Sequence, residues 1–67
     1  MFFTYIIKSV TTKRYYVGYS EDLVKRLHQH NAGQNISTKN GVPWTLIYSE
    51  KFNTRTDAWK RERQIKK

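Results

Sequence analysis

The first eight residues of the chain, MFFTYIIK, constrain the fold more than any other segment. Apolar side chains fall on both phases of the strand alternation in this run; they are Phe2, Phe3, Tyr5, Ile6 and Ile7. A strand with one wet face would place a polar residue at every second position, whereas a strand covered on both faces is apolar almost throughout. Residues 1–8 are therefore predicted to form the middle strand of a sheet.

Two further strands are predicted to flank the first. RYYVGYS, residues 14–20, follows the polar connection SVTTKR and pairs with the first strand as a hairpin. Glycine is costly inside a strand, so Gly18 indicates a bulge or a close approach of backbone or ligand at that point. WTLIYSEKF, residues 44–52, reads as the third strand after a polar loop over residues 34–43.

Two helices are predicted, over residues 21–31 and residues 53–67. The expected boundary residues of the first are Ser20 as N-cap, Glu21 and Asp22 in the first turn, and Gly33 just beyond the C-terminus. The second opens at Thr54 or Thr56. The element order is thus ββαβα, and the expected fold class is α+β, a three-stranded antiparallel sheet with a central first strand, flanked by helices.

Length and cysteine usage bound the class of protein. With 67 residues the chain makes one domain, residues 1–67, near the lower size limit for folding without disulfides or metals. It has no cysteine, which excludes disulfides and thiolate metal sites and fits a reducing compartment. Neither a bilayer-length apolar run nor a signal peptide is visible, so a cytoplasmic protein is expected.

Charge indicates the class of partner. Thirteen Lys and Arg residues against five Asp and Glu residues give a formal net charge of +8 and a pI near 10.1. Such an excess on a small body attracts polyanions, nucleic acid first and anionic membrane second. The aromatic residues lie on predicted strands rather than along one helix face, which disfavours a membrane-surface role. A surface that is basic only for solubility is the alternative.

Three helical positions are occupied by residues that packing alone does not require. At about 100° per residue, Glu62 projects from within the apolar stripe of the second helix, formed by Ala58, Trp59 and Ile65. Such a carboxylate needs an ion pair with a neighbouring arginine or a bound metal. In the first helix, Arg26 and His30 share one flank of a stripe made of Leu23, Val24 and Leu27, and are either solvated or directed at one point.

The residue types and motifs that the sequence lacks limit the reactions that it could catalyse. No cysteine nucleophile or nucleophile elbow is present, and His28 and His30 are two apart on a helix, so they cannot share a zinc ion. Tyrosine, arginine, histidine and one carboxylate remain, a set that suits phosphodiester hydrolysis with a single hard cation. Glu62 would hold Mg²⁺ or Mn²⁺, and Arg26 would neutralise phosphoryl charge. A tyrosine acting as base would need a pKa lowered by adjacent cations.

The segments Thr4-Tyr5-Ile6 and Tyr16-Val17-Gly18 together resemble the paired signature of the GIY-YIG nucleases, which include the N-terminal nuclease domain of UvrC. The resemblance continues in order through DLVKRLHQHNAG, STKNGVPWTLIYSEKF and TDAWKRERQIKK, and so covers essentially the whole chain. It is greatest to the small stand-alone bacterial members. The chain ends about one turn after Glu62, whereas the family's fold usually continues, which leaves open a truncated C-terminus.

The resemblance implies a role for each matching position. It makes Tyr5 and Tyr16 the active-site tyrosines, Arg26 the ligand of the scissile phosphate, His30 an aid to proton transfer or phosphate contact, and Glu62 the metal ligand. Lys39 becomes a secondary phosphate contact, and Arg14 and Gly18 join it among the positions expected to face nucleic acid. Gly18 would leave room for substrate or for the catalytic groups beside Tyr16.

Two functions follow as alternatives. The first is a DNA endonuclease dependent on Mg²⁺ or Mn²⁺, with a role in repair or recombination and branched or damaged DNA as its substrate. The second is a non-catalytic nucleic-acid-binding module on the same fold, with Tyr15, Tyr19 and Trp44 as surfaces on which bases stack. Either would act as a monomer or weak dimer.

Overall fold

A computed structural model describes residues 1–66. Its elements are β1 (Phe2–Ser9), β2 (Tyr15–Ser20), α1 (Leu23–Asn31), the short 3₁₀ turn η1 (Lys39–Gly41), β3 (Trp44–Phe52) and α2 (Arg55–Lys66). The predicted ββαβα order and α+β class are confirmed, and β3 has the predicted bounds. The 3₁₀ turn was not anticipated, and Lys67, the predicted end of the second helix, lies outside the described residues.

The sheet is antiparallel with strand order β2-β1-β3, which confirms that the first strand is central. Tyr5 of β1 stands opposite Gly18 of β2, and Ile7 stands opposite Tyr16. Paired residues project to the same side of a sheet, so Tyr5 and Tyr16 share one face while Thr4 projects to the other.

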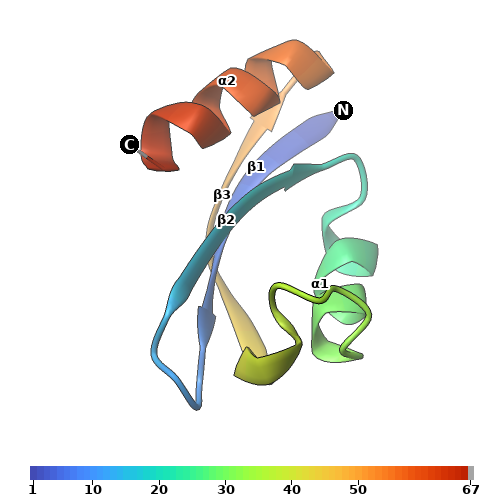
Figure 1. Cartoon of the computed structure of the whole chain (residues 1–67). Coiled ribbons are helices and arrows are strands. Elements are labelled where there is room, and N and C mark those ends of the chain that lie inside the picture. The colour runs from blue at the N-terminus through green and yellow to red at the C-terminus, as the bar shows by residue number, and fades with distance from the viewer. Residues whose placement is uncertain (67) are drawn as a thin grey trace.

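The two helices cover opposite faces of this sheet (Figure 1). Thr4 donates a hydrogen bond to α2, whereas the adjacent Tyr5 is bonded to His30 of α1, as strand alternation requires. The main core lies under α1 and contains Tyr5, Ile7 and Trp44. The second face is poorer in apolar contacts, because Ala58 is the one buried residue of α2.

Two predicted helix stripes need correction by one residue. Val24 is 81% exposed and Trp59 is 40% exposed, although both were expected to face the core. On α1 the sheet-facing residues are Leu23, Leu27 and His30, which follow the i, i+4, i+7 spacing of one face. Val24 lies about 100° away from Leu23, and Trp59 lies equally far from Ala58, so both turn outward.

The start of the first helix also differs from the prediction. Ser20 ends β2 instead of capping a helix, and its hydroxyl accepts from the backbone N–H of Asp22 at 3.2 Å. Asp22 is the N-cap and accepts from the N–H of Lys25 at 3.0 Å, so no acidic residue occupies the first turn. Gly33 ends α1 as predicted, with φ of 74°.

The second helix opens at the first of the two predicted caps. The hydroxyl of Thr54 accepts from the N–H of Asp57 at 3.1 Å. Within the described part of the chain, neither helix has the length and apolar content that crossing a bilayer requires.

Candidate active site

A chain of buried hydrogen bonds links β1, α1 and the loop before η1. The phenol oxygen Oη of Tyr5 lies 2.9 Å from Nε2 of His30, and Nδ1 of His30 lies 2.7 Å from Oγ1 of Thr38. Tyr5 is 2% exposed, His30 0% and Thr38 1%. A helical histidine was expected to be solvated or functional, and this one is completely enclosed.

The direction of each proton follows from the last link. Thr38 donates its own hydroxyl proton to the carbonyl of Asn35 at 3.4 Å, so its oxygen accepts from Nδ1–H of His30. Nε2 is then left to accept from the hydroxyl of Tyr5. Burial, and after it the charge of Arg26, lower the pKa of His30, which keeps the imidazole neutral.

Tyr5 is held in its protonated form. Burial is the main cause that raises its pKa well above 10; the neighbouring Tyr16 and the charge of Glu62 act in the same direction, and Arg26 acts against them. Tyr5 therefore does not have the lowered pKa that a tyrosine acting as base would need, because burial outweighs the charge of Arg26. A buried tyrosinate would be expensive, so Tyr5 can take up a proton only as it passes its own to His30.

Tyr16 packs on the same cluster. Its ring centroid lies 6.5 Å from that of Tyr5, 5.0 Å from that of His30 and 6.5 Å from that of Trp44. Gly18 explains how the two tyrosines fit, since a Cβ there would lie 2.6 Å from Oη of Tyr5 and 3.2 Å from Cε1 of Tyr16. The space beside Gly18 is thus filled by Tyr5, and the glycine itself is buried.

Arg26 of α1 and Glu62 of α2 both act electrostatically on this cluster. Arg26 lies one turn before His30 on α1, and its charge acts on both His30 and Tyr5. The Glu62 side chain is 13% exposed and its Oε2 lies 3.6 Å from Nζ of Lys66. Lys66 in turn lies 5.8 Å from the ring centroid of Tyr16. The expected ion pair of Glu62 is thus with a lysine beside a site tyrosine, not with an arginine.

A divalent cation fits this site with Glu62 as its carboxylate ligand. No group of three or more His, Asp or Glu side chains forms a metal cage among residues 1–66. Mg²⁺ commonly takes only one or two carboxylates and completes its shell with waters and phosphate oxygens. Glu62 can supply that carboxylate, because its partner Lys66 is 51% exposed and can move aside.

The other expected contacts lie outside the Tyr5 cluster. Lys39 is exposed on η1 next to Thr38. Arg14 is exposed just before β2 and lines a hollow with Tyr15, Tyr16 and Asn40. A second hollow, on the side of Arg26, is lined by Lys25 and Arg55 and also by the acidic residues Glu21 and Asp22.

The sequence interpretation missed Thr38, and it misplaced Trp44. Trp44 is 7% exposed, and its Nε1–H donates to the carbonyl of Thr38 at 2.7 Å, so it cannot serve as a stacking surface for bases. Asn31 closes the same corner, because its Nδ2 donates to the carbonyl of Trp44 at 3.1 Å while its Oδ1 accepts from the Trp44 N–H. The only available signal was the position of Thr38 beside Lys39.

Comparison with known proteins agrees with this architecture. A family model described as the GIY-YIG catalytic domain matches residues 1–67. A UPF0213 protein of Staphylococcus saprophyticus is 46% identical over 52 residues, which cover 76% of this chain and 63% of that protein. A UPF0213 protein of Listeria monocytogenes is 41% identical over 66 residues, which cover 97% of this chain and 73% of that protein.

A UPF0213 protein of Staphylococcus aureus is 40% identical over 65 residues, which cover 96% of this chain and 78% of that protein. The chain therefore spans less than two thirds of the Staphylococcus saprophyticus relative and about three quarters of the other two. No solved structure matches. The match over the whole chain, on a fold that brings both signature tyrosines onto one face, shows that this protein belongs to the GIY-YIG family.

Proposed function

We propose that this domain is an endonuclease that hydrolyses phosphodiester bonds in DNA with one divalent cation, Mg²⁺ or Mn²⁺. The observation that carries the proposal is the buried Tyr5–His30–Thr38 chain, on whose Tyr5 the charges of both Arg26 and Glu62 act. A small domain could fill this space with aliphatic side chains at lower cost. A polar network that keeps a histidine neutral and a phenol protonated beside both charges is typical of a reactive centre.

The charged residues divide the binding of a phosphate between them. Glu62 would hold the cation, which when bound supplies positive charge to the phosphoryl oxygens. Arg26 would bind the scissile phosphate from α1, and its planar guanidinium suits two phosphate oxygens at once. The guanidinium of Arg26 on α1 and the metal ion held by Glu62 on α2 would thus both contact the phosphate.

Proton transfer would run along the hydrogen-bond chain. The attacking water gives a proton to Oη of Tyr5 as Tyr5 gives its own proton to Nε2 of His30, so no tyrosinate accumulates. The water oxygen forms a bond to phosphorus, the bond from phosphorus to the leaving deoxyribose oxygen breaks, and that oxygen takes a proton from solvent water. Arg26 lowers the pKa of His30 in the free protein, so an anionic phosphate at Arg26 would make His30 a better base once substrate is bound.

The surroundings support DNA as the substrate. The net charge of +8 favours a polyanion, and Arg14 lines a hollow together with Tyr16 of the cluster. So small a surface is suited to reading backbone and shape more than base sequence, which is consistent with branched or damaged DNA and a role in repair or recombination. One chain supplies one site, so a monomer would cut one strand at a time.

The decisive experiment compares Glu62→Gln with the matched variant Glu50→Gln. Cleavage of supercoiled plasmid and of labelled branched DNA is measured with Mg²⁺, with Mn²⁺ and with chelator, alongside DNA affinity. Loss of the cation ligand should lower the rate at least about a hundredfold, since such a cation contributes several kcal/mol and each 1.36 kcal/mol is tenfold. Glu50, on the edge strand in a pair with Arg61, should be dispensable for cleavage.

DNA binding should persist in Glu62→Gln. A wild-type protein that binds DNA but cuts none of these substrates with either cation would refute the endonuclease and leave the non-catalytic binding module. Cleavage by Glu62→Gln at the wild-type rate would remove Glu62 from the proposed site.

A further inference from the structure

Helix α2 carries the proposed cation ligand, yet apolar packing does little to place it. Of its residues only Ala58 is buried, and five of the twelve are Lys or Arg. An alanine has almost no side chain with which to lock a helix against a sheet. Polar contacts with the sheet therefore act alongside the half-buried Ile65 in deciding how α2 is rotated and where along the sheet it lies, and hence where Glu62 points.

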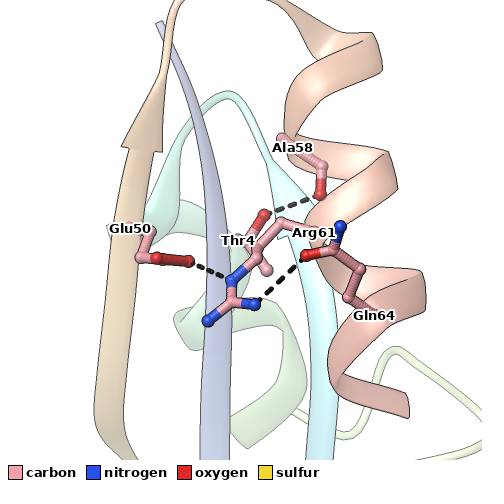
Figure 2. Close-up of polar contacts among 5 residues, drawn as sticks. All are labelled: Thr4, Glu50, Ala58, Arg61 and Gln64. Carbon is pink, nitrogen blue, oxygen red and sulfur yellow. Dashed lines mark hydrogen bonds and ion pairs between the residues drawn. The ribbon is translucent and has the colours of Figure 1, made fainter. Parts of the chain in front are cut away.

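One such contact comes from Thr4 in the middle of β1. Its hydroxyl donates to the carbonyl of Ala58 at 2.7 Å, and both residues are 0% exposed (Figure 2). In an α-helix the carbonyl of residue i accepts from the N–H of residue i+4, so the carbonyl of Ala58 is also the helical acceptor of Glu62. Thr4 therefore donates a hydrogen bond to the same carbonyl that accepts from the backbone N–H of Glu62.

The neighbour of Thr4 in the strand is Tyr5. Strand alternation sends these two side chains to opposite faces, Thr4 to α2 and Tyr5 to His30 of α1. A single peptide unit of the central strand thus connects the helix that bears the carboxylate to the proton-transfer chain. We propose that Thr4 is a positioning residue that sets Glu62 relative to Tyr5 and thereby sets the cation affinity of the site. This inference rests on the proposed function.

A second tie between α2 and the sheet is weaker. Nε of Arg61 lies 2.6 Å from Oε1 of Glu50 on β3, and Nη1 of Arg61 donates to Gln64 at 3.2 Å (Figure 2). The side chains of the ion pair are 39% and 29% exposed. Exposed pairs of long side chains are screened by water and salt and tolerate sliding of the helix. The bond of Thr4 is short and joins two residues that are 0% exposed, so solvent does not screen it.

The test compares three threonine variants. Thr4→Val removes the hydroxyl at nearly constant shape, Thr4→Ser retains it, and Thr45→Val removes an exposed hydroxyl elsewhere in the sheet. Mn²⁺ affinity is measured by electron paramagnetic resonance of the free ion, and the carboxyl carbon of Glu62 is followed by NMR without metal. Circular dichroism establishes that each variant is folded.

Thr4→Val should bind Mn²⁺ about tenfold more weakly, as expected for residues that orient metal ligands, and should shift the Glu62 carboxyl resonance. The Mn²⁺ concentration for half-maximal cleavage should rise by the same factor, with the KM for DNA unchanged. Thr4→Ser and Thr45→Val should behave as wild type. Unchanged Mn²⁺ affinity and an unchanged resonance in folded Thr4→Val would overturn the inference.

Arg61→Gln covers the case in which Thr4→Val does not fold. It should leave Mn²⁺ affinity and the Glu62 resonance at wild-type values, and a tenfold loss there would assign the placement of Glu62 to the exposed pair instead. If the wild type neither binds Mn²⁺ nor cuts DNA, the proposed function fails. The Glu62 resonance in metal-free Thr4→Val and Arg61→Gln still decides whether Thr4 positions that side chain.

Discussion

Replacing Gly18 with alanine should displace Tyr5 from its position in the candidate site. The new Cβ would lie 2.6 Å from Oη and 2.8 Å from Cζ of Tyr5, well inside van der Waals contact. Tyr5 is 2% exposed and its hydroxyl is bonded to His30, so the ring can move away only by stretching that hydrogen bond. The substitution should therefore reduce both stability and cleavage.

The expected loss is large for so small a protein. Overpacking costs about 1–3 kcal/mol, and leaving a buried polar group without its partner costs about 1–3 kcal/mol more. At about 0.05–0.15 kcal/mol per residue, a chain of this length has a free energy of unfolding of roughly 3–10 kcal/mol. Gly18→Ala should thus lose a substantial fraction of it, measured by urea unfolding with tryptophan fluorescence at low temperature.

A double-mutant cycle with Tyr5→Phe identifies the cause. The phenylalanine lacks the oxygen that the new Cβ meets first, so the combined loss should be smaller than the sum of the two single losses. Gly33→Ala is the matched control, because its Cβ would have only Cβ of Lys39 nearby at 3.8 Å while φ of 74° still strains the backbone. Strict additivity of Gly18→Ala with Tyr5→Phe, or a loss below about 0.5 kcal/mol, would show that Tyr5 does not fill this space.

Three further predictions concern the hydrogen-bond chain. The pKa of His30 lies below 6.5 in the folded protein, so the unfolded chain binds more protons than the folded chain below that pH. The free energy of unfolding should therefore fall on acidification from pH 6.5, by up to about 1.4 kcal/mol per pH unit. Urea titrations at pH 7 and 5.5 should show that His30→Gln loses this slope. The raised pKa of Tyr5 means that the free energy of unfolding should fall as pH rises above 10, because only the unfolded chain releases that proton there. The tyrosinate absorbance that Tyr5→Phe removes should appear only on unfolding. Its appearance in the native protein would contradict the burial argument. Thr38→Val should cost about 1–3 kcal/mol by leaving Nδ1–H of His30 unpaired, and ¹⁵N NMR of the imidazole should show the loss of a single tautomer.

Local patterns were enough to predict the elements and their order. Two-phase apolarity placed β1 in the centre of the sheet, and the run from Trp44 to Phe52 set the bounds of β3. These features depend on the period of two along a strand and on helix boundary residues such as Thr54 and Gly33, which are properties of neighbouring residues. The family resemblance predicted which residues form the candidate site.

The tertiary structure decided which neighbour faces the sheet and which groups meet. Val24 and Leu23 lie about 100° apart on a helix, and only the seating of α1 on the sheet determines that Leu23 turns inward. The pKa of Tyr5 is raised because burial outweighs the nearby Arg26, and burial is a property of the whole packed molecule. The bonds from His30 to Thr38 and from Thr4 to Ala58 join residues 8 and 54 positions apart, so they exist only where packing brings their helices and loops to the sheet.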